Sequence, residues 1–340
     1  MMKEISVQIN PYLEYINSLL LTGNYNEITM PVVGYGLMTD EVNEYTTGIK
    51  QLFENYRSYP IYSLIEAMIP EGFTFSRPVE LALSMGKDGD FSMQYALADF
   101  CVACCGGRLR IEELLSQMKD FEKETEFFSF YHKNKGFYDS YLNKAREVAE
   151  AHPYVTLLEK EYGVTKGSYQ LVISSLMRGN FGIVFEEKET KQPHLYAVLS
   201  THGFSLSPNI LFHEFSHPFI NPLTEKYDAI VTQYREAYER LKPYKLPGFA
   251  SGYGEWQECV NEHLVRAMVI HLLRKCNLYE EATEQLHQDL YCGYRYIPLL
   301  LEGYEYYDRN RETYPDFEAY YPELLRIFRE DIPNEYNLSY

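Results

Sequence analysis

Hydrophobic residues recur at spacings of three and four through much of residues 1–165, a pattern that predicts amphipathic helices. The clearest case covers residues 110–133, where the hydrophobic positions are Ile111, Leu114, Leu115, Met118 and Phe121. Further helices are expected over residues 76–86, 90–105 and 137–151, from capping residues, proline and glycine at their ends. We therefore expect residues 1–165 to form a helical N-terminal region.

The pattern changes near residue 168 to short runs rich in β-branched and aromatic residues, which predict strands. These runs cover residues 169–174, 181–186 and 195–199. A Gly-Asn turn signal lies between the first two, so we expect a small, mainly antiparallel sheet. Helices resume after residue 207. The fold is thus expected to be α+β and predominantly helical, with residues 166–340 as a second region or as the continuation of one unit.

Composition and charge argue against several classes of binding partner. The chain has 340 residues, with 31 Lys and Arg against 49 Asp and Glu, a net charge of −18. This charge argues against nucleic acid and anionic membrane surfaces as partners. The chain has no run of about 18 hydrophobic residues, the length that a membrane-spanning helix requires. Six cysteines in a chain of this length do not indicate a disulfide scaffold, and the first residues lack the pattern of a secretory signal, so a cytoplasmic location is expected.

A pair of histidines one helical turn apart predicts a metal site. Ser207 and Pro208 favour a helix start, after which His213 and His217 project from one face. This spacing allows both imidazoles to bind one Zn²⁺ at about 2.0–2.1 Å. In the His-Glu-x-x-His pattern the glutamate, here Glu214, takes the proton of a water that the metal activates. The sequence therefore predicts a catalytic zinc with Glu214 as general base.

A catalytic zinc requires a third protein ligand. The residues after His217 lack the third histidine of the metzincin pattern, so we expect a carboxylate from a later helix. Glu262 is the predicted ligand, because it lies mid-helix with Arg266 one turn on to orient it. Glu258, one turn earlier on the same face, is the alternative ligand and the alternative partner of Arg266.

Pro218 directly follows the second histidine. Proline removes one helix hydrogen bond and biases the preceding residue away from helical geometry. We therefore expect the helix that carries the histidines to kink or end at Pro218.

These motifs resemble the gluzincin branch of zinc metallopeptidases. Residues 213–222 read His-Glu-Phe-Ser-His-x-Phe-x-Asn-Pro, and a later helix carries Asn-Glu-x-x-x-Arg-Ala. In this detail they are similar to a family of bacterial proteins of unknown function that are predicted, from the same motif, to be zinc metallopeptidases. The resemblance extends over most of the chain. It implies a zincin-like catalytic fold, a peptide or protein substrate, zinc bound by His213, His217 and Glu262, and Glu214 as base.

Gluzincins also supply a histidine or tyrosine that stabilises the oxyanion formed when water adds to the carbonyl. The candidates here are Tyr253, His263, Tyr294 and Tyr296. The zincin arrangement further places an edge strand beside the substrate, and residues 195–200 are the candidate, with an interior strand as the alternative.

Three hypotheses follow from these residues. The first is a zinc-dependent hydrolase that cleaves peptide bonds. The second is a zincin-like module that binds metal or peptide without catalysis. The third is a helical interaction protein in which the histidine motif is accidental, and this hypothesis predicts that no metal is bound.

Overall fold

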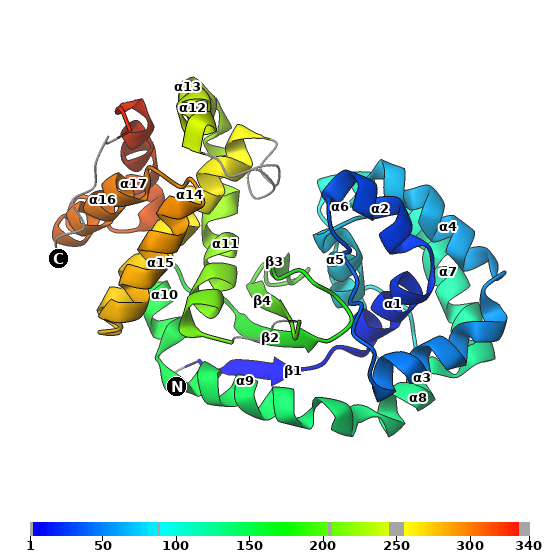
Figure 1. Ribbon diagram of the computed structural model, residues 1–340. Coiled ribbons are helices and arrows are strands. Elements are labelled where there is room, and N and C mark those ends of the chain that lie inside the picture. The colour runs from blue at the N-terminus through cyan, green and yellow to red at the C-terminus, as the bar shows by residue number, and fades with distance from the viewer. Residues whose placement is uncertain (1–2, 87–88, 203–205, 245–254, 333–340) are drawn as a thin grey trace. The chain divides into compact units, whose positions relative to one another are not determined.

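The computed structural model describes residues 3–86, 89–202, 206–244 and 255–332, and the chain divides into two compact units (Figure 1). The sheet unit comprises residues 4–150 and 167–206, and the helical unit comprises residues 1–3, 151–166 and 207–340. The chain is α+β and predominantly helical, as predicted. The division differs from the expected boundary at residue 165, because the predicted strands group with the N-terminal helices.

The sheet has four strands in the order β1-β2-β4-β3. Their bounds are β1 (Ile5–Gln8), β2 (Ser168–Ser174), β3 (Phe181–Glu186) and β4 (Pro193–Ser200). Strand β2 runs parallel to both β1 and β4, and only β3 is antiparallel to its neighbour β4. The sheet is therefore mixed, and the expectation of a mainly antiparallel sheet is wrong.

Strand β4 is an interior strand, because it pairs with β2 on one side and β3 on the other. It therefore offers no free edge for a substrate, and the edge-strand hypothesis for residues 195–200 is wrong. The turn signal does not close a hairpin between β2 and β3. Instead the Oδ1 atom of Asn180 accepts a hydrogen bond of 2.9 Å from the backbone N–H of Ser200, at the end of β4.

Helices form the remainder of the sheet unit. They are α1 (Pro11–Thr22), α2 (Tyr25–Val33), α3 (Glu44–Phe53), η1 (Glu54–Tyr56), α4 (Pro60–Met68), η2 (Ile69–Glu71), α5 (Ser76–Ser84), α6 (Asp99–Cys104), α7 (Arg108–Thr125), α8 (Phe127–Lys133), η3 (Lys135–Tyr138) and α9 (Asp139–Ala151). The helix expected over residues 110–133 is divided in two, because Glu126 adopts a left-handed conformation with φ of 50°. The helix expected over residues 90–105 is reduced to α6, since Asp90 instead accepts the N–H of Ser92 in a turn.

A buried carboxylate ties α1 to the sheet. Glu14 is fully buried and accepts hydrogen bonds from the hydroxyls of Tyr45 (2.9 Å), Tyr138 (2.6 Å) and Ser174 (2.7 Å). Burial raises the pKa of Glu14 to about 7, although these three donors oppose the rise. The hydroxyls compensate part of the cost of placing this carboxyl group in the core.

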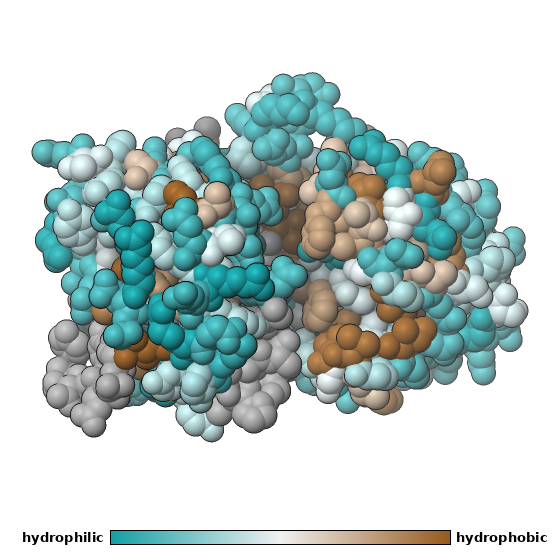
Figure 2. All heavy atoms as spheres, turned by 90° about the horizontal axis from the view of Figure 1, so that it is seen from above, coloured by the Kyte–Doolittle hydropathy of each residue, from teal (hydrophilic) through white to brown (hydrophobic). Residues whose placement is uncertain are grey.

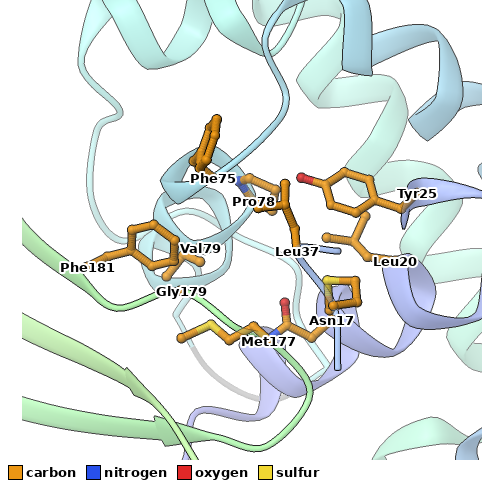
Figure 3. Close-up of a pocket in the computed structure, with 11 residues that line it drawn as sticks. Asn17, Leu20, Tyr25, Leu37, Phe75, Pro78, Val79, Met177, Gly179 and Phe181 are labelled. Carbon is orange, nitrogen blue, oxygen red and sulfur yellow. The ribbon is translucent and has the colours of Figure 1, made fainter. Parts of the chain in front are cut away.

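A small hydrophobic pocket of about 20 Å³ lies in the sheet unit (Figure 3). Leu20, Tyr25, Val79 and Phe181 are among its lining residues, and they come from α1, α2, α5 and β3. A volume of this size holds about one water molecule. None of the predicted metal ligands lines this pocket.

The helical unit is built around α14, which carries buried residues on all its sides and packs against α11, α15 and α16 (Figure 1). Its helices are α10 (Tyr154–Tyr162), α11 (Pro208–Lys226), α12 (Asp228–Gln233), α13 (Glu236–Leu241), η4 (Lys242–Tyr244), α14 (Trp256–Lys275), α15 (Tyr279–Tyr291), α16 (Ile297–Arg309), α17 (Phe317–Leu324) and η6 (Leu325–Arg329). In the second half of α14, residues 267–273 are buried without interruption, as expected of the central helix of the unit.

The face seen in Figure 2 is largely hydrophilic, with hydrophobic residues in several patches. Within the described part of the chain, no helix combines the length and the hydrophobicity needed to cross a membrane.

Candidate metal centre

Helix α11 places the two predicted histidine ligands side by side. It begins at Pro208, as expected, so His213 and His217 lie one turn apart on one face. Their Nε2 atoms are 3.1 Å apart, and their side chains are 16% and 14% exposed. Both imidazole tips therefore converge on one point beside the helix.

Helix α11 does not end at Pro218 but continues to Lys226, through a second proline at Pro222. Each proline lacks the N–H that would bond to the carbonyl four residues earlier. The carbonyl of Pro218, left without a helical donor by Pro222, accepts a hydrogen bond of 3.4 Å from Nζ of Lys166. Of the two expected outcomes, an end of the helix at Pro218 is wrong and a kink there stays a prediction. A side chain outside the helix supplies a donor for one of the freed carbonyls.

Glu262, on α14, reaches both histidines. Its Oε1 atom is 3.5 Å from Nε2 of His217, and its Oε2 atom is 3.8 Å from Nε2 of His213. Two ligands of a tetrahedral Zn²⁺ at about 2.0–2.1 Å lie about 3.3 Å from each other. The three side chains thus have the separation and the donor chemistry that fit a metal ion. Glu258, the alternative, is exposed and does not belong to this group of ligands within the described residues.

A neighbouring amide fixes the orientation of one imidazole. The Nδ1 atom of His217 is 3.2 Å from Oδ1 of Asn221, one turn further along α11. Since an amide oxygen only accepts, Nδ1 carries the proton and Nε2 keeps its lone pair facing His213 and Glu262. Partners of this kind orient metal-binding histidines and raise their basicity.

Arg266 pairs with Glu262, as predicted. Its Nε atom donates to Oε2 of Glu262 at 2.9 Å, and its Nη1 atom donates to Oδ1 of Asp289 at 2.7 Å. The guanidinium also lies over the ring of Tyr294, 4.3 Å from the ring centre. Asp289, on α15, is fully buried. This residue was not predicted, because no motif or spacing links it to Arg266, 23 positions earlier.

Burial and charge set the protonation of this cluster. Burial lowers the pKa of His213 to about 3, so its imidazole is neutral at pH 7. Burial alone would raise the pKa of Glu262, but Arg266 and the two histidines outweigh it and hold the pKa at about 2. A neutral imidazole and an ionised carboxylate are the forms that bind metal ions.

Glu214 lies next to the first histidine and is only 4% exposed. Burial, and secondly the charge of Glu262, raise the pKa of Glu214 well above its usual range. A dication bound by the neighbouring residues would oppose both effects and favour the ionised form. Glu214 is therefore a carboxyl group whose protonation responds to the charge beside it.

The four oxyanion candidates differ in their surroundings. Tyr253 lies outside the described residues. The hydroxyl of Tyr296 accepts from Nε of Arg240 and donates to the carbonyl of Glu330, so it is already engaged. His263 is buried and its Nδ1 atom bonds to the carbonyl of Cys259, while Tyr294 contacts the arginine that holds Glu262.

A second group of side chains with metal-binding donors lies on the same unit. It comprises Glu161 on α10, His271 on α14 and Asp308 on α16, whose donor atoms lie within 4.8 Å of one another. Lys275 and Arg311 both pair with both of these carboxylates, at distances from 2.5 to 3.4 Å. This cluster was not predicted, because its three residues lie on separate helices that are far apart along the chain.

A family model described as "Domain of unknown function (DUF4932)" matches residues 5–327. Neither the curated proteins nor the solved structures contain a match to this chain.

Proposed function

We propose that the chain, which belongs to the DUF4932 family, is a zinc-dependent hydrolase that cleaves peptide bonds. The observation that carries the proposal is the convergence of His213, His217 and Glu262, from two helices, with the buried Glu214 beside them. The peptide substrate follows from the resemblance to gluzincins.

His213, His217 and Glu262 would hold the ion, and their donor set is one that zinc accepts. A bound Zn²⁺ lowers the pKa of a coordinated water and polarises a carbonyl group. Asn221 keeps the Nε2 lone pair of His217 directed at the site. Three protein ligands leave room for a further group, which distinguishes a catalytic zinc site from a closed structural one.

Glu214 acts as the proton acceptor in this proposal. Its carboxylate takes a proton from the attacking water and can return the proton to the leaving amine. Its burial keeps the group shielded from solvent, so its charge acts strongly on the reacting atoms. Tyr294 and His263 are the described candidates that remain for binding the oxyanion.

The reaction is proposed to take place in the cytoplasm, because all six cysteines are free thiols in the structure. Reduced thiols suit a reducing compartment.

The test is Glu214→Gln, with Glu225→Gln, exposed on the same helix, as the matched control. Hydrolysis of a mixed peptide library should fall by about 10²- to 10⁴-fold in the first variant, the usual contribution of general base catalysis, and stay unchanged in the second. Zinc content should be equal in all three proteins. Undiminished hydrolysis by Glu214→Gln would remove Glu214 from the mechanism, and stoichiometric zinc without any hydrolysis by the wild type would favour a non-catalytic binding module.

A further inference from the structure

Helix α15 contacts both helices that carry the proposed ligands. The Oδ1 atom of Asp289 accepts from Arg266 of α14 at 2.7 Å. One turn earlier, the Oε1 atom of Gln285 accepts from Nδ2 of Asn209, in the first turn of α11, at 2.9 Å. Because residues four apart share a helix face, one face of α15 reaches towards both α11 and α14.

The guanidinium of Arg266 is constrained from three directions. Its Nε atom binds Oε2 of Glu262, its Nη1 atom binds Asp289, and its face lies on the ring of Tyr294. The planar fork of an arginine can make two such bonds at fixed angles, which a lysine cannot. Arg266 therefore fixes the plane and direction of the Glu262 carboxylate. Asp289 and Tyr294 in turn hold Arg266 in place.

Charge gives Asp289 a second role. Arg266 carries a positive charge within hydrogen-bond distance of a carboxylate that would hold a dication, and two positive groups on one carboxylate repel each other. Asp289 is fully buried and places a carboxylate on the far side of the guanidinium. The negative charge of Asp289 thus compensates the positive charge of Arg266, and Arg266 can orient Glu262 with less repulsion of the metal ion.

We propose that Arg266 and Asp289 are positioning residues that set the affinity of the site for its metal ion, by holding the Glu262 carboxylate in its binding direction. The inference rests on the proposed function, because it concerns the same metal ion. Neither residue contacts the reacting atoms in this proposal.

The test measures zinc affinity by competition with a chelating indicator, using zinc alone as the probe. Arg266→Lys and Asp289→Asn should each weaken zinc binding by about 10- to 100-fold, the usual effect of removing a partner that orients a metal ligand. The visible spectrum of the cobalt-substituted protein should change in both variants, because the ligand field depends on the direction of Glu262. Asp308→Asn is the matched control, since Asp308 also pairs with cationic side chains of this unit, and it should bind zinc like the wild type.

Thermal unfolding of the metal-free proteins shows whether each variant folds, and Arg266→Lys carries the test if Asp289→Asn does not fold. Wild-type zinc affinity and an unchanged cobalt spectrum in the folded variants would overturn the positioning role and leave the proposed function intact. A wild-type protein that binds no zinc would overturn both.

Discussion

Helix α14 contributes to two clusters of histidine and carboxylate side chains, and the clusters differ in how their charge is balanced. The first joins His213, His217 and Glu262, with Arg266 as the cation paired to Glu262. The second joins Glu161, His271 and Asp308. Both have donor atoms close enough together to hold an ion, so proximity alone does not distinguish them.

The difference lies in the cations. In the second cluster Lys275 and Arg311 each contact Glu161 and Asp308, so two positive charges already balance two negative ones. A dication there would meet two cations within a few ångströms. In the first cluster two imidazoles, at least one of them neutral, and one carboxylate face each other, while the single arginine is offset by Asp289. This difference supports the proposal of a metal site at the first cluster, whereas the second cluster is an ion-pair network that joins α10, α14 and α16.

The largest expected effect concerns metal content. Wild-type protein purified without chelators should contain about one zinc per chain, and the double variant His213→Ala/His217→Ala should contain almost none, because two of three ligands are lost. His271→Ala should retain the wild-type content. Elemental analysis measures all three, and loss of zinc in His271→Ala would break the distinction between the clusters.

The next effect is on stability. Glu161→Gln should lower the free energy of unfolding by about 2–3 kcal/mol, because Glu161 is 1% exposed and the half-buried Lys275 and Arg311 each lose one of their two carboxylate partners. Glu159→Gln is the control on the same helix. Its pair with Lys3 is partly exposed, so the loss should stay below about 1 kcal/mol. Urea unfolding in the presence of a chelator measures both, and equal losses would contradict the buried network.

The smallest effect is on pH dependence. Burial opposes protonation of His271, but Asp308 and Glu161 outweigh it and raise its pKa above the ordinary 6.5. A raised pKa in the folded state means that the stabilisation is complete below pH 6.5 and is lost as the pH rises through the folded value. The difference in unfolding free energy between wild type and His271→Asn should therefore be about 1 kcal/mol at pH 5.5 and shrink towards pH 9.

Urea unfolding of the chelated proteins across this pH range measures that difference. In an Asp308→Asn background the pH dependence should be weaker, because one of the two carboxylate partners is gone. A difference that is independent of pH would show that His271 stays neutral in this cluster.

Features that depend on a few neighbouring residues could be predicted from the sequence. The start of α11 at Pro208, the spacing of His213 and His217, and strand β3 follow from a few neighbouring residues, and the structure places them as predicted. Glu262 could be chosen over Glu258 because Arg266 lies one turn beyond it, and these two side chains do pair.

Contacts between distant segments could not be predicted. Strand β1 has only four residues and pairs in parallel with β2. The first residue of β2 lies 160 positions beyond the end of β1, so no turn between the two strands indicates that they pair. Asp289 and the cluster around His271 depend on which helix faces meet in the helical unit, and a single sequence does not record that packing. The hydrogen bond from Lys166 to the carbonyl of Pro218, where α11 continues past the proline, could not be predicted for the same reason.

The two prolines of α11 also affect the unfolded chain. A proline ring restricts the backbone before folding, so Pro218 and Pro222 each reduce the conformational entropy that the segment after His217 loses when it becomes a helix. This restriction is worth about 0.4–1 kcal/mol for each proline, and it offsets part of the roughly 3 kcal/mol that a proline inside a helix costs through its missing hydrogen bond. The unfolded chain just after His217 therefore has fewer conformations to lose, next to the histidines that are proposed to bind the metal ion.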